Sequence, residues 1–116
     1  MKSFSVLVSV LMMAGTAHAA APASFAQCSV CHAVTKGAPA GIGPTLAGVV
    51  GRKAGSAAGF SYSSALKGSK IVWSATTLDK WITNPAALVP GNKMPYGGLS
   101  DAHKRAEIIA YLKTVK

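Results

Sequence analysis

The pattern of apolar and polar residues predicts a helix shortly after Ser74. Serine is a preferred residue at the N-cap of a helix. The apolar residues that follow recur at the spacing of one helical face: Leu78, Trp81 and Ile82. The pair Asn84-Pro85 then ends the pattern, because a residue that precedes proline is disfavoured in the helical conformation. We therefore expect a helix that Ser74 caps and that runs to about Thr83.

A second helical pattern fills the C-terminal segment. Ser100, with Asp101 in the first turn, is expected to open this helix. Its apolar residues again recur at helical spacing: Ile108, Ile109, Leu112 and Val115. Lys113 and Lys116 near its end complement the partial negative charge of a helix C-terminus.

The rest of the chain contains one shorter helical segment and a long loop. Residues 23–33 are rich in alanine and contain neither glycine nor proline, which favours a short helix from Ala23 to Ala33. Residues 37–59 carry seven glycines and two prolines, a composition typical of loops. No segment shows a convincing strand pattern of period two, so we predict a small, mostly α-helical protein.

The length of the glycine-rich loop is unusual for so small a protein. Loops longer than about 12–15 residues without secondary structure are uncommon inside compact domains. This loop is explained if it wraps a large, rigid, apolar group. A flexible loop is the alternative, and composition leaves it open.

The first 19 residues have the features of a secretory signal peptide. Lys2 gives a positive start, an apolar run follows from Phe4 to Ala14, and Ala17-His18-Ala19 matches the small-x-small pattern of a cleavage site. The apolar run is too short to span a bilayer as a helix. We expect cleavage after Ala19, which leaves residues 20–116 as a single exported domain, located in the periplasm and without stable membrane insertion.

The charge of the chain is strongly basic because acidic residues are scarce. Removing Lys2 from twelve basic residues leaves eleven against three acidic ones, a net charge of +8 for the expected mature chain. No stretch is dense in arginine and lysine, as a nucleic-acid-binding surface requires. The charge therefore favours an acidic protein partner rather than nucleic acid.

Both cysteines lie in the sequence Cys28-Ser29-Val30-Cys31-His32, which has the C-x-x-C-H spacing of a c-type haem attachment site. One helical turn presents the two thiols to the two vinyl groups of one haem. The imidazole of His32 can then approach the iron. Covalent attachment keeps the haem bound although the polypeptide core is small.

Three other interpretations of this motif are weaker. A thioredoxin-like dithiol requires a βαβ setting, and the chain lacks a pattern of parallel strands. A structural zinc site requires four ligands in separated pairs, whereas only His32 and His103 accompany the two cysteines in the mature chain. A plain disulfide between Cys28 and Cys31 suits an oxidising compartment, but it leaves His32 and the long loop unexplained.

Met94 is the expected second protein ligand of the haem iron. It is the single methionine that remains after the signal peptide is removed, and it lies in a turn between Pro90 and Pro95 rather than on an apolar helix face. His/Met ligation raises the haem potential and suits electron transfer. His103, the other spare histidine, lies early in the last helix beside charged residues, which favours a solvated side chain.

Together these residues resemble the class I cytochrome c family, in its mitochondrial-type branch and its small bacterial relatives. The resemblance runs from about Phe25 to the C-terminus. It is carried, in chain order, by Cys28-Ser29-Val30-Cys31-His32, Gly43-Pro44-Thr45-Leu46, Gly51-Arg52-Lys53-Ala54-Gly55, Gly59-Phe60-Ser61-Tyr62-Ser63, Trp73, Asn84-Pro85 and Pro90-Gly91-Asn92-Lys93-Met94. It implies an all-α cytochrome c fold, with three to five short helices and long loops around one covalently bound haem c.

The resemblance also implies roles for single residues. The carbonyl of Pro44 would accept a hydrogen bond from Nδ1 of His32, and three side chains would contact the haem propionates: Arg52, Tyr62 and Trp73. Tyr111, Ile108 and Leu112 would pack the last helix against the first. Among the departures from the family pattern, Asn92 stands where the family commonly has threonine, and a short N-terminal segment clips the first helix.

The predicted function is that of an exported, monomeric, single-haem electron-transfer protein and not of an enzyme. It would carry one electron between acidic redox partners, a reductase and an oxidase or dehydrogenase. Five lysines are candidates for a basic docking ring: Lys36, Lys53, Lys67, Lys70 and Lys93. The alternative is a haem-bearing subunit of a periplasmic dehydrogenase or oxidase complex.

Overall fold

The computed structural model describes residues 19–116 together with Ser3 and Ser9. The predicted signal peptide therefore lies almost entirely outside the described residues. A 3-10 turn and five α-helices follow in order: η1 (Ala23–Phe25), α1 (Ala26–Ser29), α2 (Ser64–Lys67), α3 (Ala75–Thr83), α4 (Pro85–Leu88) and α5 (Ala102–Leu112). Within the described part the only β-type pairing is the isolated bridge between Lys53 and Val72. The prediction of an all-α fold with three to five helices is confirmed.

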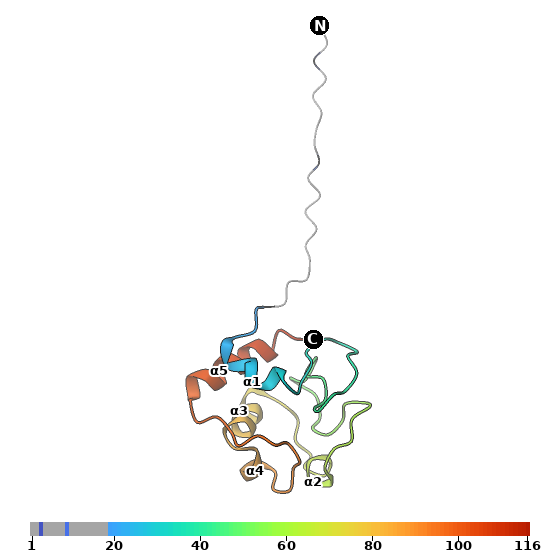
Figure 1. Cartoon of the computed structure of the whole chain (residues 1–116), viewed down its shortest axis with the longest axis vertical. Helices are drawn as coiled ribbons and strands as arrows, with labels where there is room; N and C mark the ends of the chain where they lie inside the picture. The colour runs from blue at the N-terminus through green and yellow to red at the C-terminus, as the bar shows by residue number, and fades with distance from the viewer. Residues whose placement is uncertain (1–2, 4–8, 10–18) are drawn as a thin grey trace.

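Apart from α2, the helices gather on one side of the molecule and the long loop lies on the other. In Figure 1, α1, α3, α4 and α5 lie on the left of the view, and the chain between α1 and α2 runs along the right. No helix in the described range is long and apolar enough to cross a membrane.

The helix predicted after Ser74 is present with the expected ends. The Ser74 hydroxyl accepts a hydrogen bond from the backbone N–H of Thr77, and the Thr77 hydroxyl accepts one from that of Ser74, so both side chains cap α3. Asn84 ends α3 and begins α4, where its side-chain oxygen accepts from the N–H of Ala87. The four residues of α4 are too few to produce a periodic pattern, so the sequence does not predict this helix.

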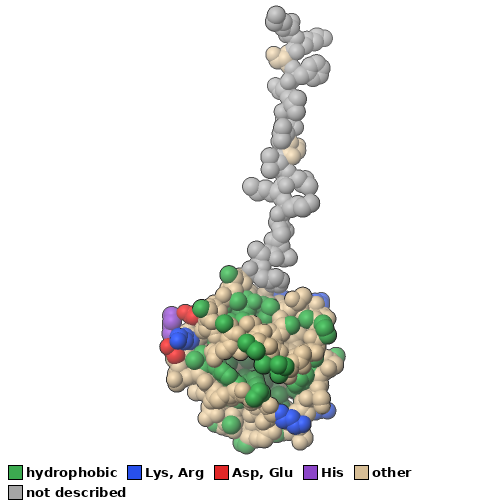
Figure 2. Space-filling model, viewed as in Figure 1, with side chains coloured by type: hydrophobic (Ala, Val, Ile, Leu, Met, Phe, Trp, Pro, Cys, Tyr) green, Lys and Arg blue, Asp and Glu red, His purple; other side chains and the backbone are tan. Residues whose placement is uncertain are grey.

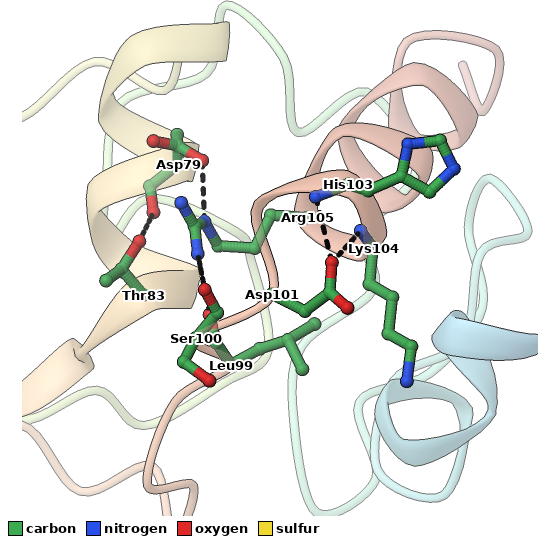
Figure 3. Close-up of polar contacts among 8 residues, drawn as sticks. All are labelled: Asp79, Thr83, Leu99, Ser100, Asp101, His103, Lys104 and Arg105. Atoms are coloured by element: carbon green, nitrogen blue, oxygen red, sulfur yellow. Dashed lines mark hydrogen bonds and ion pairs between the residues drawn. The ribbon is translucent and has the colours of Figure 1, made fainter.

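The N-cap of α5 is Asp101, and the prediction of Ser100 is wrong by one residue. The Asp101 carboxylate accepts hydrogen bonds from the backbone N–H groups of His103 and Lys104, at 3.0 and 3.1 Å (Figure 3). The Lys104 bond, reinforced by the His103 bond, holds the pKa of Asp101 below its ordinary value. The ionised carboxylate of Asp101 therefore stabilises the folded state above the ordinary carboxyl pKa. This stabilisation is lost as pH falls through the lowered pKa of Asp101.

The first helix is shorter than the predicted segment from Ala23 to Ala33. It begins with η1 and ends at Ser29, because the chain turns at Val30 and Cys31. The Cys31 carbonyl then accepts a hydrogen bond from the N–H of Gly43, which lies twelve residues further on. This long-range bond draws the chain into the loop, and alanine content alone does not reveal it.

The shortened first helix nevertheless packs against α5, as predicted. The rings of Phe25 and Tyr111 meet edge to face, with centroids 4.9 Å apart. The Ser24 hydroxyl donates to the Glu107 carboxylate at 3.2 Å, and Ile108 is 1% exposed. The contact between the first helix and α5 is therefore part of the hydrophobic core.

The glycine-rich loop is held by backbone hydrogen bonds rather than being flexible. Gly51 donates to the Trp73 carbonyl at 2.7 Å, and Trp73 donates to the Arg52 carbonyl at 2.9 Å. Ala54 donates to the Ile71 carbonyl at 2.8 Å. The loop thus lies against the segment that leads into α3, and both border the cavity described next.

Candidate haem site

A cavity of about 220 Å³ lies between the helices and the long loop. Figure 2 shows it as a hollow in one face, surrounded mainly by hydrophobic side chains. Its walls come from α1, the long loop, α2, α3, the segment around Met94, and α5. All eight residues predicted for the site border it: Cys28, Cys31, His32, Pro44, Arg52, Tyr62, Trp73 and Met94.

The imidazole of His32 is oriented by its neighbours in the loop. Its Nδ1 lies 2.8 Å from the Pro44 carbonyl oxygen, the contact that the family resemblance implies. A carbonyl only accepts hydrogen bonds, so Nδ1 carries the proton and Nε2 keeps its lone pair free for a metal ion. Gly43 packs directly against the ring, where a Cβ atom would lie 2.5 Å from Cε1.

The two cysteines are half-buried free thiols at the edge of the cavity. Burial raises the pKa of the Cys28 thiol, and the neighbouring Cys31 raises it further. Since both cysteines are free thiols, the disulfide between Cys28 and Cys31 is not formed in this structure. The zinc interpretation also lacks ligands, since no three His, Cys, Asp or Glu residues among those described are grouped to hold a metal ion.

His103, the other spare histidine, belongs to a different part of the surface. Its side chain is 84% exposed and pairs with Glu107 at 3.1 Å on α5. It does not border the cavity. The position agrees with the expectation of a solvated helix residue.

Met94 borders the cavity from a turn that Asn92 shapes. The Asn92 side chain accepts a hydrogen bond from the backbone N–H of Met94 at 3.0 Å and donates one to the Val89 carbonyl at 2.9 Å. Tyr96 then donates its N–H to the Met94 carbonyl at 2.9 Å. This role of Asn92 was not predicted from the sequence, although asparagine after Pro-Gly is itself typical of such turns.

Arg52, Tyr62 and Trp73 each secure the loop as well as bordering the cavity. The Arg52 guanidinium donates to the carbonyls of Thr45 and Ala47, at 3.0 and 3.2 Å. The Tyr62 hydroxyl accepts from the N–H of Ala57 at 3.1 Å. Trp73 is buried, with its ring centroid 5.3 Å from that of Trp81.

The cavity has the chemistry that a c-type haem requires. Its apolar walls suit a large planar ring, and the half-buried Arg52 forms no ion pair with a carboxylate in the part of the chain described here. Its charge therefore suits an acidic group of the cofactor. The hydroxyl of Tyr96 is buried at the cavity without a hydrogen-bond partner among the described residues. Burial raises the pKa of Tyr96, and the nearby Cys28 adds to this shift.

Comparisons with known proteins agree with this interpretation. The family model described as Cytochrome c matches residues 18–116. The chain is 50% identical over 90 residues to a cytochrome c2 of Rhodomicrobium vannielii, covering 78% of this chain and 72% of the relative. It is 45% identical over 95 residues to cytochrome c2 iso-2 of Magnetospirillum fulvum, covering 82% and 98%. The solved structure of cytochrome cH from Methylobacterium extorquens is similar with a TM-score of 0.74 and 48% identity, covering 78% of this chain and 91% of that one.

Proposed function

Because this chain belongs to the cytochrome c family, we propose that the eight residues at the cavity hold its haem and that the protein serves acidic redox partners in the periplasm. The chain is a single-haem electron-transfer protein with one covalently bound haem c. When bound, the haem supplies an iron that cycles between Fe(II) and Fe(III). The polypeptide supplies ligation, burial and docking.

We assign the attachment to Cys28 and Cys31 and the iron ligands to His32 Nε2 and Met94 Sδ. The observation that carries this assignment is that all four residues border one cavity and that the Pro44 carbonyl already satisfies His32 Nδ1. Such a partner fixes the tautomer and the orientation of a metal-binding histidine. Arg52, Tyr62 and Trp73 are assigned to the propionate side of the cofactor.

Replacing Met94 by alanine is expected to abolish the weak long-wavelength absorption band that reports sulfur bound to ferric iron. The same change should lower the reduction potential by on the order of 0.1 V or more, since axial ligands set haem potentials over a wide range. Visible spectra and potentiometry of the purified holoprotein measure both effects. The His103→Ala variant is the control and should keep the wild-type spectrum, because His103 is 84% exposed. Persistence of the sulfur band in Met94→Ala would contradict the assignment.

The distribution of charge supports docking to acidic partners. The three acidic residues of the described part lie on α3 or on the first half of α5 and its cap. On the face shown in Figure 2 they appear only at one edge. The five lysines of the predicted docking ring are exposed, and none of them is paired with a carboxylate in the described structure. A basic surface of this kind steers association with an acidic partner.

Electron transfer to an acidic partner protein is therefore expected to slow as ionic strength rises. Salt screens long-range attraction over a Debye length of about 10 Å at 0.1 M. Stopped-flow measurement of the second-order rate across a salt series tests this. A small uncharged reductant serves as the control, and its rate should change little. A partner rate that is equally independent of salt would contradict electrostatic docking.

The remaining features of the proposal are export, a monomeric state and the absence of an enzymatic activity. The family match begins at residue 18, close to the predicted cleavage site after Ala19, which supports residues 20–116 as the mature domain. Among the described residues that border the cavity, His32 is the one histidine and none is a carboxylate. The alternative of a complex subunit is favoured by no observation here.

A further inference from the structure

Arg105 joins α5, α3 and the chain before α5 through one largely buried guanidinium. Its Nε donates to the Asp79 carboxylate of α3 at 2.8 Å. Its Nη1 donates to the backbone carbonyls of Leu99 and Ser100, at 3.0 and 2.8 Å. The Arg105 side chain is 12% exposed, whereas that of Asp79 is 47% exposed. Figure 3 shows the guanidinium between α3 and the chain just before α5.

The two carbonyls belong to the end of the segment that carries Met94. This Met94 segment, residues 89–101, connects the end of α4 to the start of α5 and contains no helix. Asn92 shapes the turn before Met94, but the part that follows depends on contacts with other elements. Its hydrogen bonds to other elements include the bond from Leu99 N–H to the Ile82 carbonyl at 2.8 Å and the two bonds from Arg105.

The planar guanidinium is suited to this task in a way that lysine is not. It offers several N–H donors in fixed directions and can serve a carboxylate and two carbonyls at once. Hydrogen bonds that involve a charged group are stronger than those between neutral groups. Asp79 fixes the orientation of the guanidinium from the other side, so that Arg105 remains directed at the two carbonyls.

We propose that Arg105, oriented by Asp79, is a positioning residue that keeps the Met94 segment closed over the cavity. The pair thereby controls how readily an external ligand displaces the methionine. This inference rests on the proposed assignment of Met94 as an iron ligand. It gives the ion pair a role in ligation as well as in packing α3 against α5.

Imidazole binding to the ferric holoprotein, followed by its visible spectrum, measures how easily the segment opens. The binding-competent open form limits the apparent affinity, so a loosened segment binds imidazole more tightly. For Arg105→Gln we expect the affinity to rise about tenfold or more, as loss of a charge-assisted bond implies. For Asp79→Asn, which leaves the arginine in place, we expect a rise of about threefold, from weakening of a half-exposed ion pair.

The matched control is Glu107→Gln. Glu107 lies on α5 like Arg105, and its carboxylate is 41% exposed, close to the 47% of Asp79. It contacts Ser24 and His103 rather than the Met94 segment. The variant should therefore lower the guanidinium unfolding midpoint without changing imidazole affinity. A purely structural role of Arg105 would likewise lower only the midpoint.

The outcomes separate this inference from the function on which it rests. A wild-type ferric protein without the sulfur band would overturn the assignment of Met94 itself. A wild-type protein with the band, together with variants of Arg105 and Asp79 that bind imidazole as the wild type does, would overturn only the positioning role. An equal rise in Glu107→Gln would also overturn it, since general loosening would then explain the effect. If Arg105→Gln does not accumulate as holoprotein, Asp79→Asn decides the matter.

Discussion

Replacing Gly43 by alanine is expected to lower the free energy of unfolding of the holoprotein by about 3 kcal/mol, from overpacking and one weakened hydrogen bond. Gly43 is buried, and a Cβ atom there would lie 2.5 Å from Cε1 and 2.7 Å from Nδ1 of His32. The ring can yield only by weakening its 2.8 Å bond to the Pro44 carbonyl. The backbone can yield only by weakening the 2.9 Å bond from Gly43 N–H to the Cys31 carbonyl. Guanidinium unfolding measures the loss.

The control for this variant is Gly41→Ala, two residues away in the same loop. A Cβ atom at Gly41 meets nothing within 4 Å, and the backbone there is not in the left-handed region. Its unfolding free energy should stay within about 1 kcal/mol of wild type, because a compatible glycine-to-alanine change mainly restricts the unfolded chain. Equal midpoints for Gly43→Ala and Gly41→Ala would show that the ring of His32 is not confined by Gly43.

Replacing Gly98 by alanine is expected to lower the free energy of unfolding by at least about 3 kcal/mol, because backbone strain and a rigid contact combine at this position in the Met94 segment. The residue has φ +109°, which L side chains rarely adopt, and a Cβ atom would overlap the Thr83 carbonyl oxygen. The Thr83 carbonyl carbon would be 2.9 Å away. Both atoms belong to the backbone at the end of α3 and cannot rotate aside. The Met94 segment must therefore move away from α3.

The neighbouring Gly97→Ala variant is the control for Gly98. A Cβ atom at Gly97 meets nothing within 4 Å, and this glycine has no left-handed φ. Gly98→Ala should lower the unfolding midpoint and raise imidazole affinity for ferric iron, whereas Gly97→Ala should do neither. A Gly98→Ala protein with wild-type stability would contradict the close contact between this segment and α3.

The cofactor was predictable because its main signal is local. The C-x-x-C-H spacing places two thiols and an imidazole within five residues, so no tertiary information is needed to recognise a c-type haem motif. The assignment of Met94 as an iron ligand, which stays a prediction, rests on elimination, because Met94 is the one methionine outside the expected signal peptide. The helix after Ser74 was also predicted correctly, since its cap and its terminating Asn84-Pro85 lie within the helix or beside it.

The two errors in helix ends have a common cause in long-range contacts. Ser100 and Asp101 are both good N-cap residues, and the structure assigns the cap to Asp101 while the Ser100 carbonyl accepts from Arg105. The first helix stops at Ser29 rather than Ala33 because the Cys31 carbonyl accepts from the distant Gly43. Local composition permits both alternatives in each case, and partners elsewhere in the chain select one.

The arrangement of residues around the cavity depended on the tertiary structure. The bond between His32 and Pro44 spans twelve residues, and that between Arg105 and Asp79 spans 26. The family resemblance implied the first contact, whereas nothing in the sequence indicated the second. Residue types and their local spacing thus determined which cofactor this protein carries. Only packing between distant segments decided how firmly His32 and the Met94 segment are held, because hydrogen bonds and steric contacts of this kind form only once the chain has folded.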